Sequence, residues 1–274
     1  MFNENNKYIF TFWEPKEKIP AYLKLCMKTW QHFLPEYKIV ILDYQSIDEW
    51  IGKDVFDACL YENFSLSKQA DAIRCAVLKK HGGIWMDTDT IITSTTIKEI
   101  LNNKKSEFIL LDKHIGFIVA DKNSKILAKW YDGIQKNIKL YKLFYNNKMV
   151  KIFITIFRPK LKNKLEDWDF LGNYILKRPL KTKNTKKFLR LNKHKLKAFP
   201  ENNWQREYNN KLPPIELYRE FYFGEKDYSN YALSDTHGII SLHNSWTPDI
   251  YKQMTEEDFL KHNNTISNII KTII

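Results

Sequence analysis

Apolar and polar residues alternate in blocks along the first half of the chain, and these blocks predict alternating strands and helices. Lys7–Trp13 and Lys38–Leu42 are short runs rich in aromatic and β-branched residues, which is typical of strands. Between them, Tyr22–Phe33 carries apolar residues at steps of three and four, the spacing of a helix with one buried stripe. A strand, a helix and a second strand in this order predict a parallel βαβ unit.

The next helix and strand follow the same logic. From Leu66 to Val77, apolar residues recur at steps of four, three and four, which predicts a helix with a buried stripe. Gly82-Gly83 then predicts its end, because glycine reaches the left-handed backbone conformation that a helix C-terminus needs. Ile84–Met86 is a short apolar run, which we interpret as a buried strand.

Four charged residues flank this predicted strand. Asp71 and Arg74 lie three apart on the helix and therefore point the same way. Asp87 and Asp89 follow the strand, and residues i and i+2 of an extended chain project to one side. Since α/β sheets usually hold ligands at strand ends, a divalent cation holding phosphate oxygens would suit this point. A D-x-D alone is more often a solvated turn and an Asp–Arg pair alone a surface ion pair, but the combined spacing favours a functional site.

The remaining segments give a coarser prediction. We expect helices at Ile47–Leu60, Ile97–Leu101 and Thr255–Ile274, and strands at Glu107–Leu111, Ile115–Ala120 and Ile239–Leu242. Thr90–Ile92 is expected to lead the chain away from the acidic residues. Together they predict an α/β protein.

Residues 126–200 form a basic region. Apolar residues from Ile134 to Ile156 recur at steps of four and three, with lysines around them and Pro159 at the end. Such an arc either packs on the core, which we favour, or lies in an anionic membrane surface. The very basic Lys177–Lys197 is predicted to be a surface excursion.

Length and composition predict one domain. The chain has 274 residues and 43% apolar content, so residues 1–274 are expected to form a single catalytic domain with 126–200 as a helical insertion within it. The first residues do not resemble a secretory signal, and no apolar run approaches roughly 18 residues. Three widely spaced cysteines fit neither a zinc site nor a disulfide framework, which favours a reduced, cytoplasmic protein.

The net charge of +12 is concentrated in one segment. Residues 136–197 contain 19 Lys and Arg against three acids, so the other residues contain 25 basic and 29 acidic residues. A solvated basic face is one explanation, and an anionic partner is another. A nucleic-acid-binding protein would explain the lysines but not the acidic array. A metal-dependent phosphohydrolase would need more His or Asp ligands, and without a Gly-rich phosphate loop a dinucleotide or Walker-type ATP site is disfavoured.

The array resembles a known family. Ala70-Asp71-x-x-Arg74, Gly82-Gly83, Trp85 and Asp87-Thr88-Asp89 resemble the core of the DXD-containing glycosyltransferase family 32 of bacterial capsule clusters. They are also similar to the glucosyltransferase domains of large clostridial toxins. The resemblance covers about the first 120 residues well and the remainder poorly.

The resemblance implies a fold and an activity. The fold is a GT-A type nucleotide-sugar-binding fold, with a mostly parallel central sheet flanked by helices and a basic, mainly helical insertion. The activity is metal-dependent, retaining transfer of a hexose from a UDP-sugar, with UDP-galactose or UDP-glucose favoured, to a saccharide acceptor such as a lipid-linked capsule or surface polysaccharide intermediate. It implies Mn²⁺ or Mg²⁺ as the cofactor. The expected location is cytoplasmic, and a peripheral position on the inner face of the plasma membrane is the alternative that goes with the membrane interpretation of the basic arc. A host-protein-glycosylating effector is the alternative.

The resemblance also assigns residues. Asp89 would bind the metal directly, Asp87 would bind the ribose and the water shell of the metal, and Asp71 and Arg74 would hold sugar hydroxyls. Trp13 would stack on uracil, although a core Trp is an equal interpretation. The donor pocket would comprise Phe12, Trp13, Asp71, Arg74, Trp85, Asp87, Thr88, Asn244, Ser245 and Trp246.

The C-terminal His243-Asn244-Ser245-Trp246 follows the last predicted strand. By resemblance, His243 or Asn244 would complete the metal sphere, and Ser245 and Trp246 would donate hydrogen bonds to the diphosphate. A buried structural Trp beside a satisfied His is the alternative.

Two further residues are weaker candidates. His114 would lie on the acceptor side of the site, although a single His is more often simply exposed. Asp169 stands in a segment where related transferases carry Gly-Pro, but here Gly172 is followed by Asn173.

Overall fold

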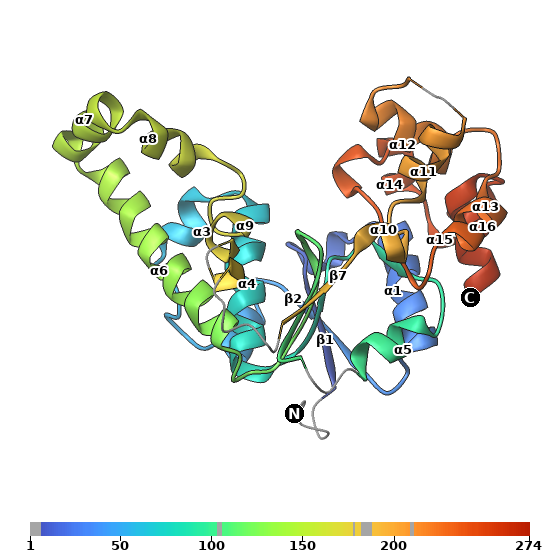
Figure 1. Cartoon of the computed structure of the whole chain (residues 1–274), viewed down its shortest axis with the longest axis horizontal. Helices are drawn as coiled ribbons and strands as arrows, with labels where there is room; N and C mark the ends of the chain where they lie inside the picture. The colour runs from blue at the N-terminus through green and yellow to red at the C-terminus, as the bar shows by residue number, and fades with distance from the viewer. Residues whose placement is uncertain (1–6, 103–105, 178, 182–187, 209–210) are drawn as a thin grey trace.

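A computed structural model describes residues 7–102, 106–177, 179–181, 188–208 and 211–274 (Figure 1). Its centre is a six-stranded sheet with the order β2-β1-β3-β6-β5-β7. The strands are β1 (Tyr8–Phe12), β2 (Lys38–Leu42), β3 (Gly83–Met86), β5 (Phe108–Leu111), β6 (His114–Ala120) and β7 (Phe188–Leu191). A separate two-stranded sheet pairs β4 (Thr90–Ile92) with β8 (Ile239–Ser241).

The central sheet is mostly parallel. Strand β1 runs parallel to β2 and β3, and β5 runs parallel to β7. Strand β6 lies between β3 and β5 and is antiparallel to both, so five of the six strands run in one direction. The predicted α/β fold with a mostly parallel central sheet flanked by helices is confirmed. The parallel order brings the carboxyl ends of β1, β2 and β3 to one edge.

Helices cover both faces of the sheet and bury two hydrophobic clusters (Figure 1). Helix α1 (Ala21–Phe33) and the C-terminal helices cover one face, while α4 (Leu66–His81) and α6 (Lys125–Asn146) cover the other. We call these two groups of buried residues the α1-side cluster and the α4-side cluster. Successive strand residues point to opposite faces, so Ile84 belongs to the α1-side cluster and Trp85 to the α4-side cluster. Burial on both sides explains why the inner strands β3 and β5 are continuously apolar, whereas the edge strands β2 and β7 each carry an exposed basic residue.

Helix α4 ends as the sequence predicts. Gly82 and Gly83 have φ of +69° and +103°, values that favour glycine. A Cβ on Gly83 would lie 2.8 Å from the Tyr8 carbonyl oxygen, so the second glycine also lets β3 approach β1. The predicted helix, its stop and the buried strand are all confirmed.

Two predicted helices are in fact broken. Ile47–Leu60 forms α2 (Ile47–Ile51) and α3 (Cys59–Asn63), because Gly52 and Asp54 adopt positive φ between them. Thr255–Ile274 forms α15 (Glu256–Lys261) and α16 (Thr265–Ile273). There the Asn264 side chain accepts a hydrogen bond from the Ser267 amide and starts a new helix.

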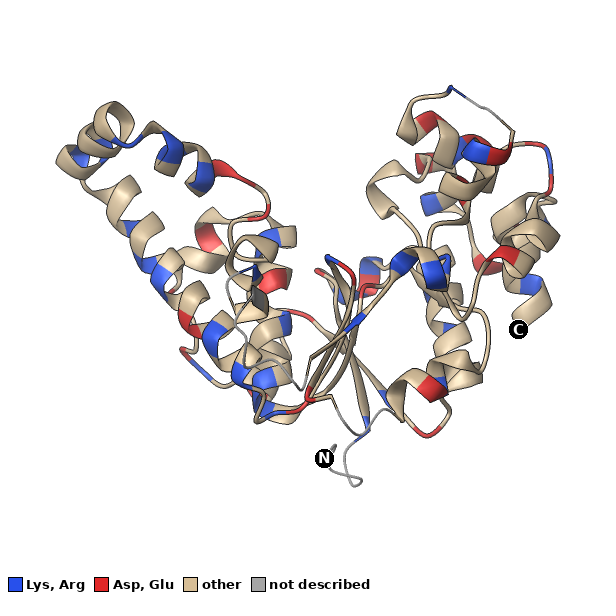
Figure 2. Ribbon diagram, viewed as in Figure 1, with Lys and Arg blue, Asp and Glu red and all other residues tan. Residues whose placement is uncertain are grey.

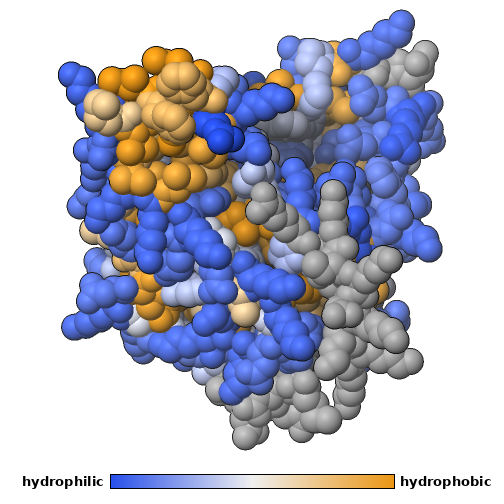
Figure 3. All heavy atoms as spheres, turned by 60° about the vertical axis from the view of Figure 1, so that its left-hand side comes forward, coloured by the Kyte–Doolittle hydropathy of each residue, from blue (hydrophilic) through white to orange (hydrophobic). Residues whose placement is uncertain are grey.

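The first half of the basic region forms an arm of three helices, α6, α7 (Lys148–Phe157) and α8 (Pro159–Glu166) (Figure 1). Asn147 caps α7 by accepting from the amides of Met149 and Val150. The expected core packing holds for α6, whose Ile134, Ile138 and Phe144 are buried. It is wrong for α7, because only Ile154 of that helix is buried. Lys and Arg residues mark the arm in Figure 2, and an apolar patch lies at the top left of Figure 3.

The predicted surface excursion at Lys177–Lys197 is wrong in part. Residues 178 and 182–187 lie outside the described residues, but 188–191 form β7 at the edge of the sheet and α10 (Lys193–Leu196) follows. The apolar side chains of Phe188, Leu189 and Leu191 outweigh the local charge because β5 offers a parallel partner.

The other elements complete the layers. They are η1 (Lys16–Lys18), α5 (Thr96–Leu101), α9 (Asn173–Leu176), η2 (Pro179–Lys181), α11 (Pro200–Glu207), α12 (Pro214–Phe223), α13 (Ser229–Asp235), η3 (Asn244–Trp246) and α14 (Asp249–Gln253). Among the described residues, no helix is both long enough and apolar enough to cross a lipid bilayer.

Candidate active site

The paired aspartates follow β3 in a tight turn. The Asp87 amide donates to the Gly116 carbonyl at 2.8 Å, and the Thr90 amide donates to the Asp87 carbonyl at 3.0 Å. The expectation of an extended D-x-D is therefore wrong, because this second hydrogen bond closes a turn over Thr88. The turn sends the two carboxylates to different partners.

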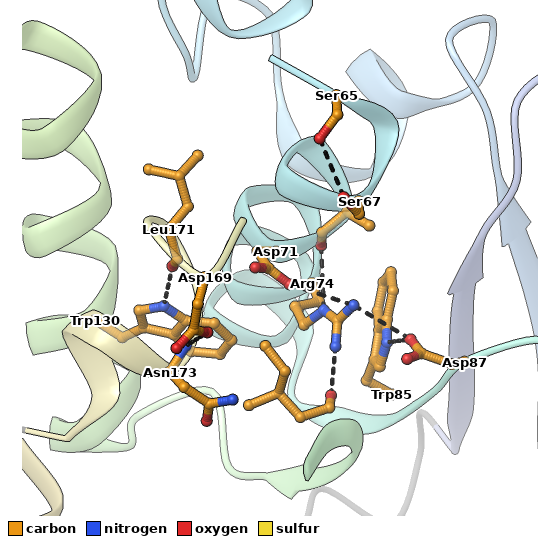
Figure 4. A network of polar contacts seen from close by, with 12 residues as sticks. Ser65, Ser67, Asp71, Arg74, Trp85, Asp87, Trp130, Asp169, Leu171 and Asn173 are labelled. Carbon is orange, nitrogen blue, oxygen red and sulfur yellow. Dashed lines mark hydrogen bonds and ion pairs between the residues drawn. The ribbon is translucent and has the colours of Figure 1, made fainter. Parts of the chain in front are cut away.

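Asp87 points toward helix α4. Its Oδ1 accepts a hydrogen bond from the Trp85 indole nitrogen at 2.8 Å and lies 3.2 Å from Arg74 Nη2 (Figure 4). The side chain of Asp87 is about one-third exposed, whereas that of Arg74 is buried. Asp87 therefore lies at the boundary between the buried network and solvent.

Arg74 connects the network. Its Nη2 lies 3.4 Å from Asp71 Oδ1, its Nη1 donates to the Ile115 carbonyl, and its guanidinium lies 4.9 Å from the centre of the Trp85 ring. One cation thus bridges two carboxylates and packs on an aromatic face. The predicted alignment of Asp71 and Arg74 on the helix is confirmed, and both residues are 5% exposed.

Asp71 is covered by the segment that follows the arm. A Cβ on Gly172 would lie 2.5 Å from Asp71 Oδ2, so only a glycine fits without displacement. The Trp130 indole nitrogen holds this segment by donating to the Leu171 carbonyl at 2.8 Å (Figure 4). Burial raises the pKa of Asp71 to about 7, and it outweighs the nearby Arg74 guanidinium, which acts in the opposite direction.

Asp89 points toward the C-terminal motif. Its Oδ2 accepts a hydrogen bond from the Asn244 amide at 2.9 Å, and its carbonyl accepts from the Leu242 amide at 2.9 Å. Burial, together with the Asp87 carboxylate, raises the pKa of Asp89 to about 7. The predicted link between the D-x-D turn and the end of the last strand is therefore present.

Asn244, whose backbone amide contacts Asp89, also carries a side-chain oxygen. Tyr22 of α1 donates a hydrogen bond from its hydroxyl to Asn244 Oδ1. Tyr22 is completely buried and also lies within reach of Thr247. Sequence reasoning missed Tyr22, because its place on the apolar stripe of α1 is that of any core aromatic residue.

His243 lies in an aromatic stack. Its ring is parallel to that of Phe199, with 5.6 Å between centroids, and lies 4.3 Å from Trp246. Burial lowers the pKa of His243 to about 4, so the ring is neutral at pH 7. Trp246 is half-buried and Ser245 is exposed.

His114 lies beside Asp87 rather than in open solvent. A Cβ on Gly116 would lie 2.6 Å from both Asp87 Oδ2 and His114 Cε1, so these two side chains meet over the glycine. Burial lowers the pKa of His114, and among the described residues its buried Nδ1 has no hydrogen-bond partner. Gly116 had no sequence signal beyond being an isolated glycine, and Gly172 stood out only as the glycine of the segment where related transferases carry Gly-Pro.

The other candidate residues differ in exposure. Phe12 is buried in the α4-side cluster, and Trp13 is half-buried against the α1-side cluster. Trp85 and Thr88 are buried, and Trp85 contacts Arg74 and Asp87. The residues predicted to contact uracil and the diphosphate, which are Trp13, Ser245 and Trp246, thus all have solvent-accessible surface.

The side-chain oxygen atoms of the turn and of the C-terminal motif are of the chemical type that binds hard divalent cations. Asp87, Asp89 and the Asn244 side chain offer carboxylate and amide oxygens, the ligands that Mg²⁺ and Mn²⁺ prefer. Within the described ranges, no three His, Cys, Asp or Glu residues converge as a complete metal cage. This set suits an ion that keeps waters and substrate phosphates in its coordination sphere.

The topology and the acidic turn define an α/β protein with a cluster of carboxylates at the strand ends, the edge where α/β sheets commonly bind ligands. Residues 2–222 match the model of the family described as capsular polysaccharide synthesis protein. Because this match covers most of the chain, the protein belongs to that family.

Comparison with solved structures gives distant similarities. The chain is similar to the glycosyltransferase GlyE of Streptococcus pneumoniae TIGR4, with 11% identity and a TM-score of 0.41, over 97% of this chain and 63% of GlyE. It is similar to the PaToxG glycosyltransferase with 17% identity and a TM-score of 0.35, over 66% of this chain and 82% of that one. The chain thus spans less than two-thirds of the length of GlyE. No curated protein matches it.

Proposed function

We propose that the protein is a metal-dependent, retaining glycosyltransferase of capsular polysaccharide synthesis. It would move a hexose from a UDP-sugar, with UDP-galactose or UDP-glucose favoured, to a saccharide acceptor such as a lipid-linked intermediate. The observation that carries the proposal is the acidic turn after β3, where Arg74 ties Asp71 to Asp87 while Asp89 contacts Asn244. Family membership supports the same assignment.

In this proposal, Asp89 would bind Mn²⁺ or Mg²⁺ directly, Asp87 would bind the ribose and the water shell of the metal, and the Asn244 oxygen would complete the coordination sphere. The bound ion stabilises the negative charge that grows on the departing diphosphate. The raised pKa of Asp89, which reflects burial and a neighbouring carboxylate, supports the assignment because a cation would favour the ionised form.

The remaining residues bind and orient the donor. Trp13 stacks on uracil, and Ser245 and Trp246 donate hydrogen bonds to the diphosphate. Asp71 and Arg74 hold the sugar hydroxyls, since a carboxylate and a guanidinium offer complementary acceptors and donors. Because Gly172 covers Asp71, donor binding requires the 167–172 segment to move away from that carboxylate.

The proposed reaction is a front-face displacement. The acceptor oxygen forms a bond with the anomeric carbon as the bond from that carbon to the diphosphate breaks. The acceptor proton passes to the leaving phosphate, so no separate carboxylate nucleophile is needed.

A panel of nucleotide sugars, each with and without manganese, tests the proposal. We expect one UDP-sugar to be hydrolysed slowly without acceptor and to raise the melting temperature, both only with the metal present. Stabilisation should grow with ligand concentration as mass action requires. Equal melting temperatures across the whole panel, with no hydrolysis, would contradict the proposal.

A further inference from the structure

Helix α7 presents a continuous apolar stripe to solvent. Met149, Ile152, Phe153, Ile156 and Phe157 occupy positions i, i+3, i+4, i+7 and i+8, which is one face of a helix. They are 75%, 45%, 53%, 62% and 67% exposed, respectively. The opposite face, through buried Ile154 and partly buried Val150, attaches the helix to the α4-side cluster.

This orientation is the reverse of that expected for a surface helix that packs its apolar face against a hydrophobic core. In an ordinary amphipathic helix the large apolar side chains face inward, whereas here five of them face outward side by side. Other exposed large apolar residues, such as Tyr44, Tyr208 and Ile250, lie on separate parts of the fold. A contiguous exposed patch of this kind marks an interaction surface.

The patch is surrounded by positive charge. Residues 147–165 contain six basic residues and no acidic residue. They are Lys148, Lys151, Arg158, Lys160, Lys162 and Lys164, and they belong to the arm in Figure 2. Lys162 lies 3.5 Å from Glu166, and Lys164 donates to the Tyr174 hydroxyl. The other four form no ion pair with any residue in the described ranges.

The positive charge around the patch indicates whether it binds a second copy of the chain or a lipid surface. A second copy of the chain would place one basic segment against another, and like charges brought together oppose association. An anionic lipid surface matches both properties, since acyl chains accept the apolar stripe and headgroup phosphates accept the lysines. At ten residues, α7 is roughly 15 Å long and would lie in the plane of the surface.

We propose that α7 docks the protein on an anionic membrane surface, with its five exposed apolar side chains inserted at the headgroup–acyl boundary. The docked helix α7 then lies at the far end of the arm. At the near end, Trp130 of α6 holds Leu171 by a hydrogen bond, and the neighbouring Gly172 covers Asp71. The docking does not depend on the reaction proposed above, and it can be tested without any substrate.

Sedimentation of the full chain with vesicles tests the proposal. We expect binding to vesicles of phosphatidylcholine with phosphatidylglycerol, weaker binding at high salt, and no binding to phosphatidylcholine alone. The double variant Phe153→Ser/Phe157→Ser should weaken binding about tenfold or more, and Met149→Ser/Ile156→Ser should do the same. Lys148→Glu/Lys151→Glu should also weaken binding.

Matched controls separate docking from general effects. Ile250→Ser removes an apolar side chain that is 64% exposed on α14, and Lys211→Glu/Lys226→Glu makes the same charge change at exposed lysines outside the arm. Both controls should leave vesicle binding unchanged, and circular dichroism should show all variants folded.

Three results would overturn the proposal. The first is equal binding to neutral and anionic vesicles. The second is unchanged binding in both stripe variants. The third is a dimer, detected by light scattering, that the stripe variants dissociate, because the patch would then bind a second copy.

Discussion

Arg74 is the residue on which the site geometry depends most. Its buried guanidinium compensates two carboxylates and contacts the Trp85 ring, so its loss would leave Asp71 in a low-dielectric interior without a counter-charge. Asp87 would also lose the partner that orients it.

Replacing Arg74 should therefore destabilise the fold and not only the reaction. We expect Arg74→Met to lower the free energy of unfolding by about 3–5 kcal/mol, measured by urea denaturation at pH 8. Adding Asp71→Asn should restore part of the loss, because the uncompensated charge is then gone. The exposed Arg206→Met is the matched control, and an equal loss in that variant would refute the argument.

Asp89 should matter for the reaction without being needed for the fold. In Asp89→Asn, the new amide oxygen still accepts from the Asn244 amide, so thermal unfolding should stay near that of the wild type. Transfer and donor hydrolysis should fall below detection in a radiolabelled UDP-sugar assay. Near-normal turnover with saturating manganese would rule out Asp89 as the metal ligand, and exposed Asp249→Asn serves as the control.

At the scale of elements, the sequence predicts what depends on local periodicity. The α4 helix, the Gly82-Gly83 stop and β3 were predictable because spacing and backbone conformation decide them. The predicted buried stripe of α4 is correct for Ile73 and Val77 but wrong for Leu66, which is 47% exposed at the start of the helix.

The break at Gly52 was not predicted, since apolar residues continue at helical spacing on both sides of it. The break at Asn264 was missed, although residues 261–265 contain no apolar residue and Asn264 caps the new helix. Strand β7 was not predictable because its pairing with β5 is long-range. The turn at Asp87–Asp89 is closed by a local hydrogen bond, but its start is set by the long-range bond from the Asp87 amide to the Gly116 carbonyl, which the sequence does not show.

The segment that covers Asp71 has a clear steric requirement. In Gly172→Ala, the new Cβ would press on Asp71 Oδ2 and on Ile115 Cδ1, 2.8 Å away, so we expect a loss of about 1–3 kcal/mol in stability and a larger fall in kcat/KM than stability explains. Gly133→Ala is the matched control, because its Cβ would press only on Ile175. A similar fall in kcat/KM for both variants would show that overpacking alone is responsible.

At the scale of the whole molecule, two cores share one sheet, and the α1-side core contains a buried acid. Glu201 of α11 accepts a hydrogen bond from the Tyr222 hydroxyl of α12 at 3.0 Å. Burial raises the pKa of Glu201 from 4.5 to about 7. The folded protein therefore keeps this proton at a pH where the unfolded chain has lost it.

Stability should consequently fall as the pH rises from about 4.5 to about 7, and the contribution of Glu201 should be constant above that range. A shift of this size corresponds to roughly 3 kcal/mol. Glu201→Gln should remove this part of the pH dependence and make the protein more stable at pH 8, as measured by urea denaturation across the range. An unchanged slope would show that the carboxyl is not responsible.

The length of α6 acquires a meaning if its far end rests on lipid. With 22 residues, this helix is roughly 33 Å long, and one end is fixed against the catalytic core while the other leads into α7. The length of α6 would then determine the distance between the acidic turn and the lipid headgroups. If the proposed acceptor is lipid-linked, adding or removing whole helical turns in α6 should then change how many sugars must separate the end of the acceptor from its lipid before the protein can extend it.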